Sequence, residues 1–326
     1  MNKAIFAILI PFLLGACATA SPASPSAGGG ETETPIPAAT STSTPEVPMN
    51  PVSLFRITNE TDPLKDPYGA AIDSAGRLFI TDAGNGRVLV FDRDGSLLAK
   101  WDAQGSENGQ FQSMGFGALA IDAQDNVFVV DNGNHRIQKF DRDGNFLAAW
   151  GSQGKGDGQF VRAIGIAVDS VGNVYVTDDG NPFVQKFDND GNFLMKFGGE
   201  GTGPGEFKHA TGIAVDLQGN IFVADYELQR VQKFDASGAV LTEWKMGAGV
   251  SEPGIPEGIA IDAHGNVYVS DYKLGRVEIF SNDGTPLGVW GEIGFFRRPT
   301  AICFSPDGRV FVVSQSGNRV DAFQLP

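Results

Sequence analysis

Acidic side chains recur along the chain at a fixed spacing, and they are the first residues whose chemistry needs an explanation. One acidic position, followed nine residues later by a second, recurs at intervals of 43–49 residues, and in the sixth copy both positions are serine. The first position is occupied by Asp73, Asp122, Asp169, Asp216, Asp262 and Ser305. The second is occupied by Asp82, Asp131, Asp178, Asp225, Asp271 and Ser314.

A basic residue follows the second position after five residues in five of the six copies. The residues at this place are Arg87, Arg136, Arg230, Arg276 and Arg319, with Phe183 in the third copy. A carboxylate and a guanidinium on either side of one turn can form charge-assisted hydrogen bonds. Because a catalytic residue has no reason to recur in every copy, we interpret the pair as structural, pinning a turn or linking adjacent repeats.

Two further patterns look like binding loops. Residues 92–95 and 141–144 read Asp-Arg-Asp-Gly, and 188–191 read Asp-Asn-Asp-Gly, which resembles the start of a calcium loop. They lack the later Glu and the flanking helices of such a loop, and Asp-Gly is typical of hairpin turns, so we predict turns. The glycine-rich run 199–205 opens no helix, as a phosphate site requires, and we predict a loop.

The chain has three histidines, His135, His209 and His264. A zinc site made of three histidines requires that they converge. We expect His264 in a turn on the opposite face from the other two. The sequence therefore predicts no such site, and we expect no bound metal and no cofactor.

Short apolar runs surround these polar positions and predict β-strands. Between residues 212 and 241, runs rich in β-branched and aromatic residues alternate with Gly, Asn, Asp and Ser, as in short strands joined by tight turns. The same pattern recurs six times. A fixed period in the forties with several strands in each unit is typical of a β-propeller.

Linked motifs within the repeat make it resemble the NHL repeat family. Trp150-Gly151 leads through spaced glycines to Gln159-Phe160, and further copies contain Gly-Ile-Ala-Val-Asp and Arg-Ile-Gln-Lys-Phe-Asp. The resemblance covers nearly everything from Leu64 to Phe323. It implies an all-β, six-bladed β-propeller, but it does not imply a function, because sites are grafted on folds.

The sixth copy stops after its third strand, near Phe323. The strand-like segment 52–58 precedes the first full copy. We predict that this segment supplies the missing fourth strand and closes the ring, so that fewer strand edges remain open.

Composition excludes some partners. The net charge of −15 repels phosphate backbones, so we expect no nucleic acid, although RNA binding occurs among animal proteins with this repeat. Cys17 and Cys303 are the two cysteines and cannot build a disulfide framework. We interpret Cys303 as a small buried side chain rather than a reactive thiol.

The N-terminal segment predicts a lipoprotein. Residues 1–16 read as a signal peptide whose apolar run ends in Leu-Gly-Ala before Cys17, which resembles the bacterial lipobox. Cys17 would carry the lipid, palmitate included, and anchor the protein in the membrane with its domain outside the cytoplasm. An ordinary secretory signal is the alternative. Residues 17–50 are rich in Ser, Thr and Pro and predict a disordered tether, and residues 51–326 predict the propeller, which we expect to be a monomer.

One face of the propeller is the predicted site. It is formed by loops that enter the first strand and loops that join the second strand to the third. Near the axis we expect Asp66, Tyr68, Arg162, His209, Thr211, Glu257 and Arg298. Further out we expect Asn134, His135, Asp179, Tyr226, Glu227, Tyr272 and Lys273. Paired tyrosines beside charged groups are typical of recognition surfaces. The predicted ligand-binding residues are Arg162, His209, Glu257, Tyr226, Tyr272 and Lys273.

These residues predict a lipid-anchored binding platform for protein, peptide or cell-envelope glycan. Related propellers suggest an alternative, a metal-dependent lyase or lactone hydrolase with its site in the central channel, although we find no match to their ligands. A third alternative is a structural spacer of the envelope.

Overall fold

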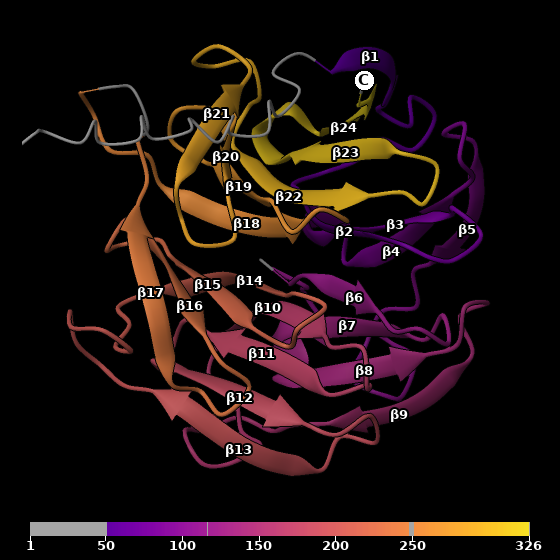
Figure 1. Ribbon diagram of the computed structural model, residues 1–326. Helices are drawn as coiled ribbons and strands as arrows, with labels where there is room; N and C mark the ends of the chain where they lie inside the picture. Colours follow the sequence, from indigo (N-terminus) through magenta and orange to yellow (C-terminus); the bar gives the residue numbers. More distant parts are fainter. Residues whose placement is uncertain (1–50, 116, 248–250, 326) are drawn as a thin grey trace, which may run out of the picture. The chain divides into compact units, whose positions relative to one another are not determined.

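The computed structural model describes residues 51–115, 117–247 and 251–325. In this part of the chain, 24 strands form six four-stranded antiparallel sheets, the blades of the propeller (Figure 1). No helix within these residues is long and apolar enough to cross a membrane. The predicted signal peptide, Cys17 and the tether lie outside the described residues.

Each of the first five blades contains four consecutive strands, numbered from the axis outward. Blade one contains β2 (Pro67–Ile72), β3 (Leu78–Asp82), β4 (Arg87–Phe91) and β5 (Leu97–Trp101). Blade two contains β6 (Leu119–Ile121), β7 (Val127–Asp131), β8 (Arg136–Phe140) and β9 (Phe146–Trp150). Blade three contains β10 (Ala163–Val168), β11 (Val174–Asp178), β12 (Phe183–Phe187) and β13 (Phe193–Gly198).

Blade four contains β14 (Ala210–Val215), β15 (Ile221–Asp225), β16 (Arg230–Phe234) and β17 (Val240–Lys245). Blade five contains β18 (Pro256–Ile261), β19 (Val267–Asp271), β20 (Arg276–Phe280) and β21 (Pro286–Trp290). Blade six contains β22 (Pro299–Phe304), β23 (Arg309–Ser314), β24 (Arg319–Gln324) and β1 (Val52–Ile57). Short 3₁₀ turns η1 (Ala83–Asn85), η2 (Asn132–Asn134) and η3 (Gln315–Gly317) join the second and third strands of blades one, two and six.

The innermost strands form a closed ring. Each of β2, β6, β10, β14, β18 and β22 contacts the next, and β22 contacts β2. Glycine makes this close approach possible: a Cβ on Gly212 would meet the carbonyl oxygen of Glu257, and one on Gly258 would meet that of Thr300. The recurring glycine of the repeat therefore lies where neighbouring blades meet.

The N-terminal strand closes the ring as predicted. Strand β1 pairs with β24 in antiparallel register, with Ile57 opposite Val320 and Arg56 opposite Asp321. Figure 1 shows the indigo β1 beside the yellow β24 at the C-terminal end of the chain. Blade six thus takes strands from both ends of the described chain, which removes the open edge that β24 would otherwise present.

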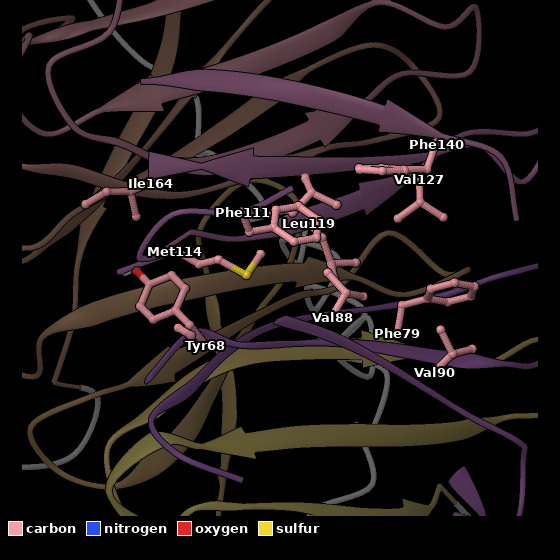
Figure 2. Packing of buried hydrophobic residues seen from close by; sticks show 12 residues of the cluster. Tyr68, Phe79, Val88, Val90, Phe111, Met114, Leu119, Val127, Phe140 and Ile164 are labelled. Carbon is pink, nitrogen blue, oxygen red and sulfur yellow. The ribbon is translucent and has the colours of Figure 1, made fainter. Parts of the chain in front are cut away.

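The core lies between the blades. The second and third strands are covered on both faces by neighbouring blades, whereas the outer strands alternate between more and less exposed residues. Figure 2 shows the cluster between blades one and two, with Tyr68 and Ile164 at one end and Phe79, Val90 and Phe140 toward the other. Each hydrophobic face of a blade is therefore buried only by the next blade.

An aromatic side chain from one blade covers a glycine turn of the next. Trp101 at the end of β5 lies against Gly144 in blade two. Trp150 and Phe197 lie in the same way against the turn glycines of blades three and four. Phe55 of β1 contacts Gly95 of blade one in the same way. The tryptophan and the Asp-Gly motif of the repeat are therefore two halves of one contact between blades.

The three Asp-x-Asp-Gly segments form turns, as predicted. The Asp92 carboxylate accepts hydrogen bonds from the backbone N–H groups of Asp94 and Ser96 within its own turn. Asp141 and Asp188 make equivalent bonds. These carboxylates stabilise local turns between the third and fourth strands.

The recurring Asp–Arg pair follows the prediction in some blades and departs from it in others. The Nε of Arg87 donates to Asp82 at 2.7 Å, and Arg136 donates to Asp131 at 2.8 Å. In blade four the prediction of a direct Asp–Arg pair is wrong, because Arg230 donates to Glu243 and to two carbonyls of the preceding loop instead. In blades one to five these aspartates also accept backbone N–H groups from the loop that enters the first strand.

Cys303 is partly rather than fully buried, and it packs against the cluster that contains Ile57 and Phe311. Burial raises the pKa of its thiol well above the usual value. Because the thiolate is the reactive form, this shift agrees with a packing role.

Candidate functional site

The wall of the central channel is mostly apolar, and the polar side chains of the candidate site lie at one of its mouths. Its wall is made by the six innermost strands and includes Ala70, Leu119, Ile166, Ile213, Ile259 and Ile302. Two positions earlier in each blade, the residues are Tyr68, Gly117, Ile164, Thr211, Glu257 and Thr300. In four of the six blades a polar side chain therefore lies at the end of the channel where the first strands begin.

A cavity of about 200 Å³ opens at this mouth. Its lining residues are Tyr68, Arg162, Ile164, Asp179, His209, Thr211, Tyr226, Glu257 and Tyr272. Five of the six residues predicted from the sequence are thus brought together. Lys273 is the exception, because it does not line this cavity and its ammonium pairs with Glu252 at 3.1 Å.

Tyr68 and Glu257 form the buried floor of the cavity. The Tyr68 hydroxyl donates a hydrogen bond to Oε1 of Glu257, across the ring from blade one to blade five. Burial raises the pKa of Glu257 to about 7, an effect that the bond from Tyr68 opposes and the nearby Asp179 carboxylate reinforces. Burial also raises the pKa of Tyr68 well above its usual value. Glu257 can therefore exchange a proton near neutral pH.

Arg162 and His209 flank the carboxylate of Asp179. The Arg162 guanidinium donates to Oδ2 of Asp179, and Nε2 of His209 lies 3.7 Å from Oδ1. Among the described residues, Asp179 Oδ1 and the Thr211 hydroxyl are buried and accept or donate no hydrogen bond. A buried polar group left without a partner costs roughly 1–3 kcal/mol. A ligand with hydroxyl or amide groups would recover this free energy.

The same backbone contact positions the site residues of three blades. The N–H of Asp179 donates to the carbonyl of Arg162, at 3.0 Å. The N–H groups of Tyr226 and Tyr272 donate in the same way to the loops that enter the first strands of blades four and five. In blade three the buried Asp178 also accepts the N–H groups of Val161 and Arg162. The recurring aspartate therefore holds the loops that carry the variable side chains.

Asp179, Tyr226 and Tyr272 occupy the same place in blades three, four and five, directly after the second recurring aspartate. The sequence predicts Tyr68, Asp179 and Thr211 on this face, but they are not among the predicted ligand-binding residues. The signal that could have identified Asp179 was its equivalence to the two selected tyrosines.

The two tyrosines form one aromatic wall. Their ring centroids are 6.0 Å apart with an interplanar angle of 64°. The Arg298 guanidinium lies 5.3 Å from the Tyr272 ring centroid, and the Tyr272 hydroxyl donates to Gln315 Oε1 at 3.2 Å. These contacts hold the Tyr272 ring in place at the rim of the cavity.

The residues at the mouth do not fit a metal centre. Within the described ranges, no three His, Cys, Asp or Glu side chains are grouped so that they could hold a metal ion. Of the histidines, only His209 is among the residues that line the cavity.

Comparisons with known proteins agree with this architecture. A family model described as an NHL repeat matches residues 118–140, and one described as a 6-bladed beta-propeller matches residues 170–251. The chain is a six-bladed β-propeller in which one stretch, residues 118–140, matches an NHL repeat. A search of curated proteins returned no match.

Solved structures share the fold at low sequence identity. A streptogramin B lyase aligns with a TM-score of 0.60 at 14% identity, covering 83% of this chain and 98% of its own. A gluconolactonase from Xanthomonas campestris aligns with a TM-score of 0.60 at 20% identity, covering 80% and 86%. The calcium-binding protein regucalcin from Agrobacterium tumefaciens aligns with a TM-score of 0.60 at 13% identity, covering 85% and 95%. These likenesses concern the fold alone.

Proposed function

We propose that this propeller is a binding platform whose ligand enters the cavity at the channel mouth. The observation that carries the proposal is the convergence of Arg162, His209, Tyr226, Glu257 and Tyr272 from three blades around one cavity. A concave site with aromatic walls and a few polar groups is the usual form of a small-ligand pocket.

The unpartnered polar atoms support binding at this cavity in particular. Asp179 Oδ1 and Thr211 Oγ1 lack hydrogen-bond partners among the described residues, although nearly all buried polar groups in folded proteins have one. The ligand classes that fit are a protein or peptide segment and a cell-envelope glycan.

Calorimetric titration of the full-length protein with defined envelope peptides and oligosaccharides tests the proposal. We expect at least one to bind, and we expect Tyr226→Ala and Arg162→Ala each to weaken binding by about tenfold or more, because central aromatic and arginine side chains contribute most. Lys273→Ala is the matched control, since Lys273 is a neighbour that does not line the cavity. Equal losses in all three variants, or no binding by any probe, would reject the cavity as the site.

A second candidate function rests on Glu257. A buried carboxyl with a pKa of about 7 suits general acid–base catalysis at neutral pH, and lyase and lactonase propellers share this fold. We test it by following turnover of a gluconolactone and of a streptogramin B with native protein and with Glu257→Gln. Turnover that Glu257→Gln abolishes would favour the enzyme, and absence of turnover would remove this candidate.

We further propose that Cys17 carries the lipid anchor, so that the propeller works at the membrane surface outside the cytoplasm. The lipobox-like Leu14-Gly15-Ala16-Cys17 at the end of the apolar run supports this proposal. A lipid anchor would hold the binding face in the cell envelope, and the protein would encounter its ligand there.

A further inference from the structure

A second, larger hollow adjoins the cavity on the same face. Its volume is about 590 Å³, and its lining residues include Asp66, Asn85, Gln104, Ser113, Gln315 and Ser316. Tyr272 lines both the hollow and the cavity, and Arg298, which stacks on Tyr272, lines the hollow. We call the hollow the amide groove. We treat the cavity and the amide groove as one depression, because Tyr272 lines both.

The chemistry of the amide groove is polar and almost uncharged. Among the described residues that line it, only Asp66 and Arg298 are charged at neutral pH, and they have opposite signs. The others are amides, hydroxyls, glycines and one alanine, apart from Tyr272. Amide side chains both donate and accept hydrogen bonds, so they match ligands that carry many hydroxyl groups.

Some of this hydrogen-bonding capacity is unused. Gln315 accepts from the Tyr272 hydroxyl through Oε1, and its amide nitrogen donates to no described residue. In the adjoining cavity, Asp179 Oδ1 and Thr211 Oγ1 are buried and have no hydrogen-bond partner among the described residues. The Gln315 amide nitrogen in the groove and the Asp179 and Thr211 oxygens in the cavity therefore remain available to a ligand, beside the rings of Tyr226 and Tyr272. The Asn85 and Gln104 amide nitrogens already donate to carbonyl groups of the protein.

The alternative ligand, a peptide, fits less well. Peptides bind through an open strand edge or through apolar pockets for anchor side chains. The groove is formed by loops and turns rather than a strand edge, and alanine is the one aliphatic side chain among its described lining residues. A nucleic acid would need a basic surface, whereas the protein has a net charge of −15.

We propose that the depression binds an uncharged oligosaccharide, with a terminal sugar in the axial cavity and the following sugars along the amide groove. A sugar ring has an apolar face that can lie against Tyr272 or Tyr226, and hydroxyl groups that can donate to Asp179 and exchange hydrogen bonds with Thr211 and Gln315. This inference rests on the proposed binding function and names its ligand class.

The test measures how affinity depends on chain length. Full-length protein is titrated with uncharged oligosaccharides of one to six units from three series: β-1,4-linked glucose, α-1,4-linked glucose and β-1,4-linked N-acetylglucosamine. In at least one series we expect affinity to rise about tenfold or more from the monosaccharide to longer chains and then level off, as each added unit gains net hydrogen bonds.

Ser316→Trp places a bulky ring at an exposed position of the groove, and Ser96→Trp is the matched control at an exposed serine outside it. We expect Ser316→Trp to remove the gain with chain length while leaving the affinity for the monosaccharide unchanged. Gln315→Ala, which truncates one amide, should reduce the same gain.

The outcomes separate this inference from the proposed function. If an envelope peptide binds and no oligosaccharide does, the proposed oligosaccharide ligand is wrong, while the proposed binding function stands. If affinity does not depend on chain length, or if Ser316→Trp and Ser96→Trp have equal effects, the amide groove is not part of the binding site. If Ser316→Trp fails to fold by circular dichroism, an unchanged length dependence in Gln315→Ala overturns the groove instead.

Discussion

The Tyr68 hydroxyl donates a hydrogen bond to the Glu257 carboxylate, although 189 residues separate them in the sequence. They occupy equivalent places at the start of the innermost strands of blades one and five. The bond therefore exists only because the ring closes. It places a carboxyl that titrates near neutral pH at the floor of the candidate site.

The pH dependence of stability should report on Glu257. Its pKa rises from 4.5 to about 7 on folding. Between these values the folded state holds a proton that the unfolded state has lost, so this group stabilises the protein fully below pH 4.5. This contribution to the free energy of unfolding, on the order of 3 kcal/mol, is lost as pH rises through 7. Urea unfolding from pH 4.5 to 8 measures it.

Glu257→Gln provides the comparison, because glutamine keeps an acceptor for Tyr68 without titrating. We expect the free energy of unfolding of native protein, relative to this variant, to fall as pH rises from 4.5 to 8. Parallel curves for the two proteins would show that Glu257 does not titrate in this range.

Ring closure by β1 predicts unequal effects of two substitutions on that strand. Ile57 is 4% exposed and packs between blades six and one, whereas Leu54 is 43% exposed. Ile57→Ala should lower the free energy of unfolding by roughly 2–5 kcal/mol, and Leu54→Ala should change it little. Chemical denaturation of both variants measures the difference. Similar small losses would indicate that β1 contributes little to closure.

The contact between Trp101 and Gly144 predicts a cost for a single methyl group. A Cβ on Gly144, where φ is +91°, would lie 2.5 Å from Trp101 Nε1. Gly219→Ala is the control, because its φ is +82° but the nearest atom would be 4.0 Å away. Both variants should lose roughly 1 kcal/mol from the left-handed backbone, and Gly144→Ala should lose more through displacement of the indole. Equal melting temperatures for the two would contradict the contact.

Asp178 should act on binding through the loop that it holds. It accepts N–H groups from Val161 and Arg162, and Arg162 lines the cavity. Asp178→Ala should cost at least about 2 kcal/mol of stability, since it leaves buried donors without an acceptor. It should also weaken ligand binding, while Asp178→Asn, which retains an acceptor, should lose less of both. Calorimetry and urea unfolding test the pair, and equal losses for the two variants would reject this role.

The anchor prediction is tested on whole cells. Native protein expressed with a labelled palmitate precursor should incorporate the label and sediment with membranes, because the Cys17 thiol would receive the lipid. Cys17→Ser should do neither, while Cys303→Ser, at the other cysteine, should behave like the native protein. Labelling of the Cys17→Ser variant would contradict the assignment.

The repeat by itself determined the fold. Strand and turn signals within one copy depend on neighbouring residues, so the six blades, the Asp-Gly turns and the closing role of residues 52–58 followed from local pattern and count. The face on which Arg162, His209, Tyr226, Glu257 and Tyr272 lie also followed, because propeller connectivity assigns every loop to one side.

Only the tertiary structure decided which of these side chains meet. Lys273 follows Tyr272 directly in sequence, yet it turns to Glu252 instead of the cavity, and Arg230 leaves its expected partner Asp225 for Glu243. The bond between Tyr68 and Glu257, the absence of a hydrogen bond to Asp179 Oδ1 among the described residues, and the place of Tyr272 in the lining of both cavity and amide groove depend on distances across the ring. Spacing along the chain carries no information about such distances, because side-chain direction and the packing of one blade on another set them.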